Sequence, residues 1–230
     1  LQQNAEFEQE LSLLKEDTTR FRDKNWVGKL LYIAALAMAF YHLYTTVTGV
    51  PSAMVHRPIH FGFALLLMFL AFDRKGKRVE KSKLSLLECL GIAAAIAMVI
   101  FYLINRKYLM TYMWYMTPVT TAAICITVLV LALAIFSGRR MVGNIFICIS
   151  IAFIIYAWAG PYLPGLLAHR GIALNKFCDT MALIPEGVFG GAMGVSATYI
   201  FNFILFGAFL KASKVGNFFI DIAMALAGQS

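Results

Sequence analysis

Six apolar runs, each close to the length that crosses a bilayer, restrict the folds open to this chain. A helix of about 20 mostly apolar residues spans the hydrocarbon core of a membrane. The runs cover 27–50, 56–72, 84–104, 118–136, 141–163 and 187–210. We therefore predict an all-α polytopic membrane protein with about six transmembrane helices, accompanied by amphipathic helices at the interface.

The composition excludes several other classes of protein. Apolar residues make up 60% of the 230-residue chain and charged residues 14%, whereas soluble domains have roughly 45–50% and 25%. An ordinary soluble domain, a disordered chain and a nucleic-acid-binding domain are therefore excluded. The four cysteines lie far apart without a CxxC pair, so neither a disulfide framework nor a metal site is predicted. Because the sequence has no nucleophile-elbow, zincin or P-loop motif, we do not expect an enzyme.

The basic residues predict the orientation of the helices. Loops on alternate sides of the six runs carry 15 and 5 of the 20 Lys and Arg residues. The positive-inside rule places the richer side in the cytosol, and the short loop 73–83 contributes most to that bias. The N-terminus is therefore predicted to be cytosolic, with six crossings returning the chain to that side. The net charge of +8 fits anionic membrane lipid as a partner better than nucleic acid.

Three shorter segments have the character of interfacial or peripheral helices. Residues 1–24 carry six acidic side chains with Phe7, Leu11 and Leu14 at helical spacing, which predicts an amphipathic helix or a solvated face. Residues 174–184 repeat apolar side chains at helical spacing up to Pro185, which predicts a helix on the outer surface. The stretch 217–228 is apolar but too short to span a membrane.

Histidine and arginine residues near the second run form the first group of candidate site residues. Arg57 and His60 are predicted at the outer face together with His169 and Arg170 of a later loop. This set is either a docking surface that attracts anions or a set of topological signals. The pair His42 and His60 also allows a haem between two helices, and His56 with His60 allows a shared metal, although no supporting ligands accompany either pair.

The sixth run supplies the second group. Glu186 precedes this run, where a carboxylate favours a helix N-terminus. Glycines four residues apart, Gly187 with Gly191 and Gly190 with Gly194, predict close packing against another helix. Hydrogen-bonding side chains follow at Ser196, Thr198 and Asn202, where they either line a pathway or bind neighbouring helices.

Several of these segments together resemble one transporter family. They are LYTTVTGV (43–50), HRPIHFGFALLL (56–67), GPYLPGLLAHRG (160–171), EGVFGGAMGVSATYIFNFILFGAFL (186–210) and NFFIDIAMALAG (217–228). The chain resembles fused permeases of tripartite ATP-independent periplasmic (TRAP) transporters, of the type that works with a TAXI-class binding protein. The resemblance implies a cytosolic amphipathic segment over 1–25, a four-helix small-subunit scaffold over 26–140, and a connecting helix with the beginning of the large transport subunit over 141–230.

The resemblance also implies a function. It implies sodium-driven uptake of an organic acid or related solute across the bacterial inner membrane, with Na⁺ as coupling ion and no tightly bound cofactor. The expected partners are a TAXI-type periplasmic binding protein, facing Arg57, His60, His169 and Arg170, and the remainder of the large subunit. Because such permeases are longer, we expect this chain to be a fragment or truncation that is incomplete for transport. The alternatives are a haem-binding membrane anchor of a redox enzyme and a purely structural membrane assembly subunit.

Overall fold

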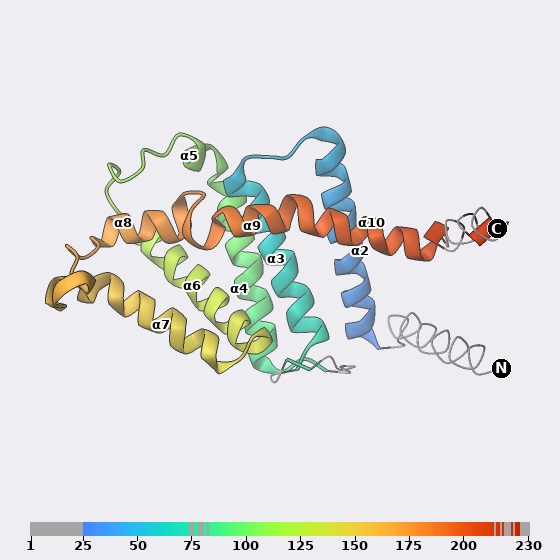
Figure 1. The fold of residues 1–230 in the computed structure, drawn as a ribbon, viewed down its shortest axis with the longest axis horizontal. Coiled ribbons are helices and arrows are strands. Elements are labelled where there is room, and N and C mark those ends of the chain that lie inside the picture. Colours follow the sequence, from blue (N-terminus) through green and yellow to red (C-terminus); the bar gives the residue numbers. More distant parts are fainter. Residues whose placement is uncertain are drawn as a thin grey trace.

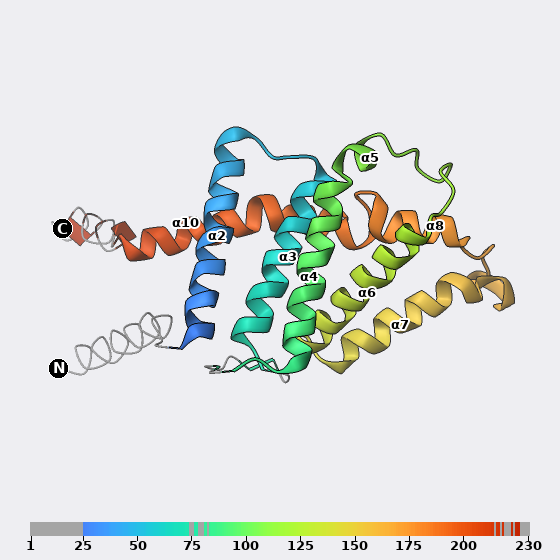
Figure 2. The ribbon, with the colours of Figure 1, turned by 180° about the vertical axis from the view of Figure 1, so that it is seen from behind.

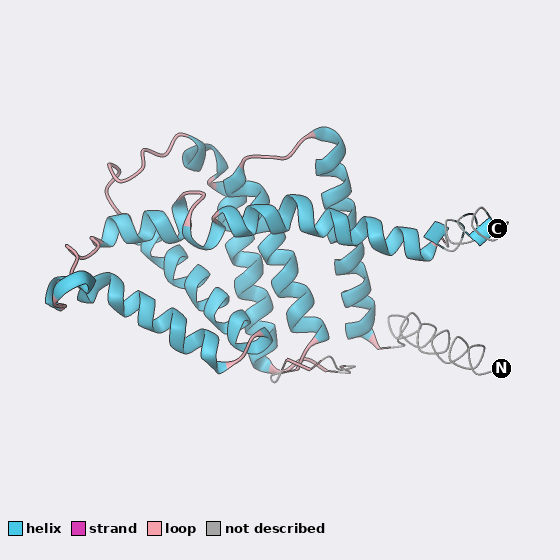
Figure 3. Ribbon diagram, in the orientation of Figure 1, coloured by secondary structure: helices cyan, strands magenta, loops and turns pink. Residues whose placement is uncertain are grey.

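The sequence forms helices throughout the part of the chain that the computed structural model describes, namely residues 25–73, 76–77, 81, 83–213, 215–216, 218, 222 and 224–225. Figure 3 shows helices joined by loops and no strand in these residues. Six helices are long and apolar enough to cross a membrane, so the predicted fold class is confirmed. The helix predicted in 1–24 lies outside the described residues, as does most of the stretch 217–228.

Four long helices form a bundle in which they stand side by side (Figures 1 and 2). They are α2 (Trp26–Thr48), α3 (Ala53–Ala71), α4 (Leu86–Ile104) and α6 (Thr121–Met141). In the most apolar window of α3, 56% of the residues are buried, against 22% in α2 and in α4. The helix α3 is therefore the centre of the bundle, and its neighbours present a larger share of their apolar side chains to the surroundings.

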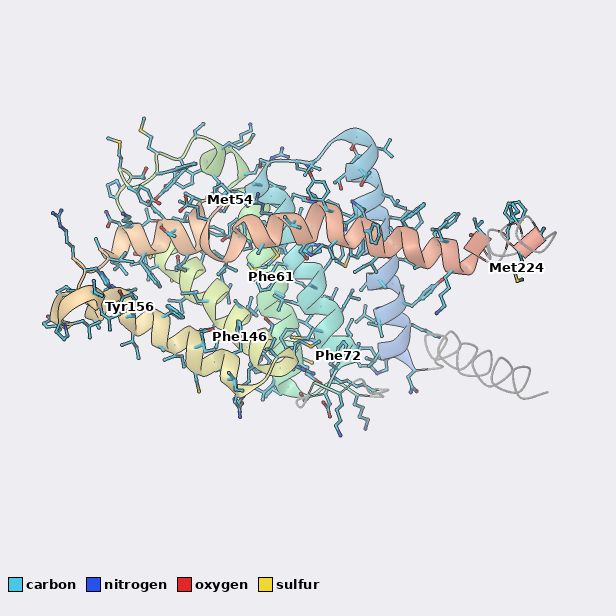
Figure 4. All side chains as sticks on the ribbon, viewed as in Figure 1. Met54, Phe61, Phe72, Phe146, Tyr156 and Met224 are labelled. Atoms are coloured by element: carbon cyan, nitrogen blue, oxygen red, sulfur yellow. The ribbon has the colours of Figure 1, made fainter. Side chains whose placement is uncertain are left out.

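The two ends of the bundle differ in charge. The loop between α3 and α4, residues 72–85, carries the basic run, and we call this end of the bundle the basic end. The opposite end holds the short α2–α3 loop, residues 49–52, and the short helix α5 (Arg106–Met110) (Figure 1). The helix α7 (Asn144–Ala159) starts at the basic end and leans away from the bundle, with none of its residues buried. Figure 4 shows Phe146 and Tyr156 along this helix.

Local sequence explains where the bundle helices begin and end. The Ser85 side chain and Glu88 form a capping box at the start of α4. Gly49 adopts a φ of 99° after α2, a conformation that favours glycine. The backbone carbonyl of Ser52 then accepts from the amides of Val55 and His56, at 2.9 and 3.0 Å. The helix α3 consequently begins at Ala53, earlier than the apolar run at 56 predicted.

The segment that follows α7 runs across the bundle helices instead of alongside them (Figures 1 and 2). It comprises α8 (Leu174–Cys178), a π-helical turn (Asp179–Leu183), a 3₁₀ turn (Gly187–Phe189), α9 (Gly191–Val195), a second π-helical turn (Ser196–Ile200) and α10 (Phe201–Ala212). The last three form a continuous helix, Gly191–Ala212, which we call the crosswise helix. It meets the length and composition expected of a sixth spanning helix, but its direction differs from that of the bundle. The return of the chain to the side of the N-terminus stays a prediction.

The helix predicted before Pro185 is present, but the bundle covers one of its sides. Phe177, Asp179 and Ala182 are buried, and the Tyr102 hydroxyl of α4 donates to the Ala182 carbonyl at 2.6 Å. Farther along, the ring of Phe189 contacts that of Phe61 on α3, with centroids 6.2 Å apart. The segment is therefore anchored in the core of the bundle before the crosswise helix begins.

Candidate functional site

The candidate site lies where the crosswise helix passes α2 and α3, near the opposite end of the bundle. It has three parts: a chain of buried histidines, the guanidinium group of Arg57, and two adjoining grooves beside the α2–α3 loop. These parts come from segments far apart in the sequence, and the polar contacts between them join the bundle to the crosswise helix.

Two histidines and a serine form a continuous hydrogen-bonded chain. The Nδ1 atom of His42 lies 2.8 Å from the Met38 carbonyl oxygen, one turn earlier on α2. Its Nε2 atom lies 3.0 Å from Nδ1 of His60 on α3. The Nε2 atom of His60 lies 3.1 Å from Oγ of Ser196 on the crosswise helix. Both histidines are buried, with exposed fractions of 0% and 5%.

The hydrogen-bond partners of His42 and His60 show which ring nitrogens carry protons. A carbonyl only accepts, so His42 donates from Nδ1 to Met38, and neutral His42 accepts at Nε2. His60 then donates from Nδ1 to His42 and accepts at Nε2 from the Ser196 hydroxyl. Each contact holds one proton. With these donors and acceptors, all three contacts are satisfied when both rings are neutral.

A third histidine reaches the crosswise helix one residue further on. His56 lies with Nε2 3.3 Å from the Ala197 carbonyl oxygen, to which it donates, and accepts from the Tyr41 hydroxyl at Nδ1, 3.0 Å away. Two consecutive residues of the crosswise helix are thus hydrogen-bonded to α3, Ser196 as donor to His60 and Ala197 as acceptor from His56. Both belong to the π-helical turn, a feature often found at functional sites.

Arg57 extends the same contact toward the start of the crosswise helix. Its Nη1 atom donates to the carbonyl oxygens of Phe189 and, at 3.3 Å, Pro185. The guanidinium group packs against Gly194, where an added Cβ would lie 2.8 Å from Nη2 of Arg57. The ion pairs seen in the described part of the chain join Glu88 to Lys81 and Arg140 at the basic end, and neither involves Arg57. Arg57 is therefore a partly buried cation that backbone carbonyls solvate without neutralising.

Asn202 continues the polar contacts along the crosswise helix. Its Nδ2 atom donates to Thr46 Oγ1 at 3.0 Å and to the Thr198 carbonyl at 2.7 Å. Its Oδ1 atom is buried with no hydrogen-bond partner. These residues line a groove of about 770 Å³ whose other walls are mostly apolar. A second groove of about 400 Å³ lies beside Arg57, and the two share Val50, Thr198 and Tyr199.

The histidines do not fit the haem or metal considered for them. The nitrogens of His42 and His60 that an iron would need are bonded to each other, and the remaining nitrogens bind Met38 and Ser196. Both nitrogens of His56 are likewise occupied. In the described residues, no three His, Cys, Asp or Glu side chains come together as a metal site.

The four residues predicted to form a docking surface do not lie together. His60 is buried inside the bundle, because its two nitrogens face His42 and Ser196, so it presents no surface to a partner. His169 lies beyond α7, where it contacts the Tyr156 carbonyl at 2.9 Å, and the adjacent Arg170 is exposed. His60 therefore does not form an exposed surface together with these residues. Docking of a binding protein at Arg170 stays a prediction.

The residues predicted on the sixth run divide into two sets. Gly194, Ser196, Thr198 and Asn202 take part in the contacts just described, whereas Gly191 has open space around it. Gly190 precedes the helix, and Gly187 adopts a φ of 48° in the preceding turn. Glu186 lies before that turn, exposed, with the Tyr115 hydroxyl 3.4 Å from its carboxylate. It therefore does not head the helix itself.

Sequence reasoning missed a closed ionic cluster at the basic end. Glu88 of α4 binds both Lys81 and Arg140, the latter at 2.9 Å. Arg140 also donates to the carbonyls of Phe72 and Asp73. Burial lowers the pKa of Lys81, although its hydrogen bond to Glu88 and the Glu88 charge oppose this change. Glu88 and Arg140 are 52 residues apart, and no pattern in the sequence indicates that they pair.

Comparison with known proteins adds one finding. Residues 127–230 match the family model described as "Tripartite ATP-independent periplasmic transporter, DctM component". No curated protein and no solved structure matches the chain. The match begins within α6 and includes all of the crosswise helix. Because the matched family is a transporter family, the match is consistent with the expectation that the protein is not an enzyme. Together with the six membrane-spanning-like helices, the match also fits a multi-pass membrane protein.

Proposed function

We propose that this chain is a membrane permease component of a TRAP secondary transporter. The observation that carries the proposal is the match of residues 127–230 to the DctM component of such transporters. The fold supports it, since the matched part includes a crosswise helix with π-helical interruptions that contacts a compact bundle. Irregular helical backbone of this kind persists in membranes where protein or a cavity satisfies its polar groups.

Within this proposal the two parts of the chain have different roles. Residues 26–140 act as a small-subunit scaffold, and residues 141–230 as a connecting helix and the beginning of the large transport subunit. Packing around α3 makes the first part a stable support. The hydrogen bonds from His56 and His60 to the crosswise helix provide the attachment between the parts. The Oδ1 atom of Asn202 leaves one acceptor in that attachment for a further group.

The transported solute and the driving force follow from the same family. We propose sodium-driven uptake of an organic acid across the inner membrane, with the N-terminus in the cytosol. A periplasmic binding protein, of the TAXI type, delivers the solute to the permease. The exposed side chains of α7 and α10 provide apolar surface for further helices of the permease or for lipid.

Uptake by membrane vesicles tests the proposal. Vesicles containing the permease to which this chain contributes are loaded with K⁺ and diluted into Na⁺ or K⁺ buffer with a labelled organic acid, with and without the binding protein. We expect accumulation that requires both Na⁺ and the binding protein. Accumulation without either one would contradict the driving force or the delivery. No uptake, with stable assembly into a larger membrane complex, would favour a purely structural subunit.

A further inference from the structure

Among the described residues, Arg57 has no carboxylate partner. It lies in the first turns of α3, half-buried, and its described hydrogen bonds go to two backbone carbonyls through Nη1. A charged side chain inside a membrane protein is costly unless it is paired or reaches water. The buried arginine of the bundle, Arg140, does have a carboxylate partner, Glu88. Arg57 therefore calls for an anion from outside the described chain.

The grooves beside Arg57 have a lining that is complementary to an amphiphilic molecule. The 400 Å³ groove is lined by the guanidinium group, by the α2–α3 loop residues Val50 and Pro51, and by the exposed ring of Tyr199. Through Val50, Thr198 and Tyr199 it continues into the 770 Å³ groove. The second groove is walled by apolar side chains of the crosswise helix, among them Phe203 and Phe206. One end of the combined groove is cationic and the other is apolar.

We propose that this combined groove binds an anionic phospholipid, with the phosphate at the guanidinium group of Arg57 and an acyl chain against Phe203 and Phe206. A phosphate accepts two parallel hydrogen bonds from a guanidinium group, which supplies the missing anion. The apolar walls next to the cation favour an anion with an acyl chain over a soluble anion, because the acyl chain covers apolar side chains that would otherwise face water. The position near the ends of α2 and α3 matches the depth of lipid headgroups. This inference does not rest on the transport function.

Native mass spectrometry of the purified chain tests the proposal. The probes are dioleoyl-phosphatidylglycerol, dioleoyl-phosphatidylcholine and glycerol 3-phosphate, which has the phosphate without the chains. We expect phosphatidylglycerol to bind at one saturable site and to raise the melting temperature. R57Q should weaken this binding about tenfold, the loss expected from one charge-assisted contact. The matched control R170Q changes an exposed arginine beyond α7 and should leave the binding unchanged.

Two further variants separate the headgroup from the chain. R57K keeps the positive charge and should retain the preference for phosphatidylglycerol over phosphatidylcholine. V50W keeps Arg57 but fills the wall that both grooves share, and it should lose the bound lipid even if R57Q fails to fold. Equal binding of phosphatidylcholine, unchanged binding in V50W, or stabilisation by glycerol 3-phosphate equal to that by the lipid would each overturn the proposal. The last result would assign the groove to a soluble anion.

Discussion

Polar clusters at the two ends of the bundle hold their elements together by different means. At the basic end, Glu88 pairs with Lys81 and Arg140 and ties the 72–85 loop and α4 to α6. At the opposite end, His60 joins α2 and α3 to Ser196 of the crosswise helix through neutral hydrogen bonds. The first cluster is closed within the bundle, whereas the second connects the bundle to an element that runs across it.

The difference has an energetic consequence. Removing one member of a buried ion pair leaves an uncompensated charge, which is far more costly than a lost neutral hydrogen bond. The basic end is therefore expected to tolerate little change. A neutral chain such as His42, His60 and Ser196 can separate with a smaller penalty, because no isolated charge results. The contact with the crosswise helix is thus the weaker of the two.

The largest expected effect comes from the basic end. E88Q should destabilise the protein by about 3–5 kcal/mol, because Lys81 and Arg140 lose the carboxylate that they share. Thermal unfolding in detergent measures the change. E186Q, at the exposed carboxylate, is the control and should have almost no effect. K81M should cost much less than E88Q, since Glu88 keeps Arg140. Equal losses of stability in E88Q and E186Q would contradict the importance of the buried ion pairs at the basic end.

The opposite end of the bundle also holds a hydrogen bond to a carboxylate. Removing it shows whether the loss of stability depends on the charge of the contact or on the end of the bundle at which the contact lies. Tyr112 donates to Oδ1 of Asp179 at 2.7 Å, and Asp179 is fully buried. Y112F should cost about 1.5–3 kcal/mol, the range for hydrogen bonds to charged groups. A loss below that of H60L, described below, would show that location matters more than charge.

The same tyrosine predicts a pH dependence. Burial, reinforced by the hydrogen bond to Asp179 and its charge, raises the pKa of Tyr112 above its ordinary value. A pKa raised in the folded state contributes stability below about pH 10, the value of a free phenol, and this stability is lost as the pH rises further. Unfolding midpoints between pH 9 and 11 should fall more steeply for the parent protein than for Y112F. Parallel slopes would contradict the assigned contact.

The histidine chain should give a smaller loss. H60L removes two neutral hydrogen bonds and leaves His42 Nε2 and Ser196 Oγ without their partner, which should cost about 1–3 kcal/mol. A double-mutant cycle of H60L with S196A should show a coupling energy of at least about 0.5 kcal/mol. S150A is the matched control, because the Ser150 hydroxyl is exposed and bonds only within its own helix. Additive effects of H60L and S196A would separate the two residues energetically.

The smallest expected loss of stability comes from disturbing the packing of Arg57 against Gly194. G194A adds a Cβ that would lie 2.8 Å from the guanidinium Nη2 atom, so the side chain must shift away from its two carbonyl partners. We expect a loss of about 1 kcal/mol, at the low end for overpacking. G191A, three residues earlier and in open space, should be neutral or slightly stabilising. Melting curves of both variants distinguish them, and identical curves would contradict the close packing at Gly194.

Features set by local periodicity and composition were predictable from the sequence. The apolar runs predicted six long helices, and the structure contains them. The boundaries shifted where capping decided them, as at Ser52 and Ser85. The involvement of Ser196 and Asn202 in contacts between helices was one of two alternatives considered from the sequence, and they do bind α3 and α2. Whether they also line a pathway stays a prediction.

The parts of the site that sequence reasoning missed depend on distant pairings. His60 was predicted at an outer surface, yet it lies inside because the crosswise helix covers it. Nothing in a run of apolar residues specifies whether the helix stands alongside its neighbours or lies across them, since both arrangements bury the same kind of side chain. The direction was decided by contacts such as those of Arg57 with the carbonyls of Pro185 and Phe189.

The sequence by itself determined that this chain forms long apolar helices, because hydrocarbon admits only backbone whose hydrogen bonds are satisfied within the segment. It also determined where charge is tolerated, at helix ends and loops. Only the tertiary structure decided which polar groups meet, because hydrogen bonds and ion pairs act over a few ångströms between residues as far apart as His60 and Ser196. That short range is why Glu88 is neutralised within the bundle while Arg57 is left for an anion from outside it.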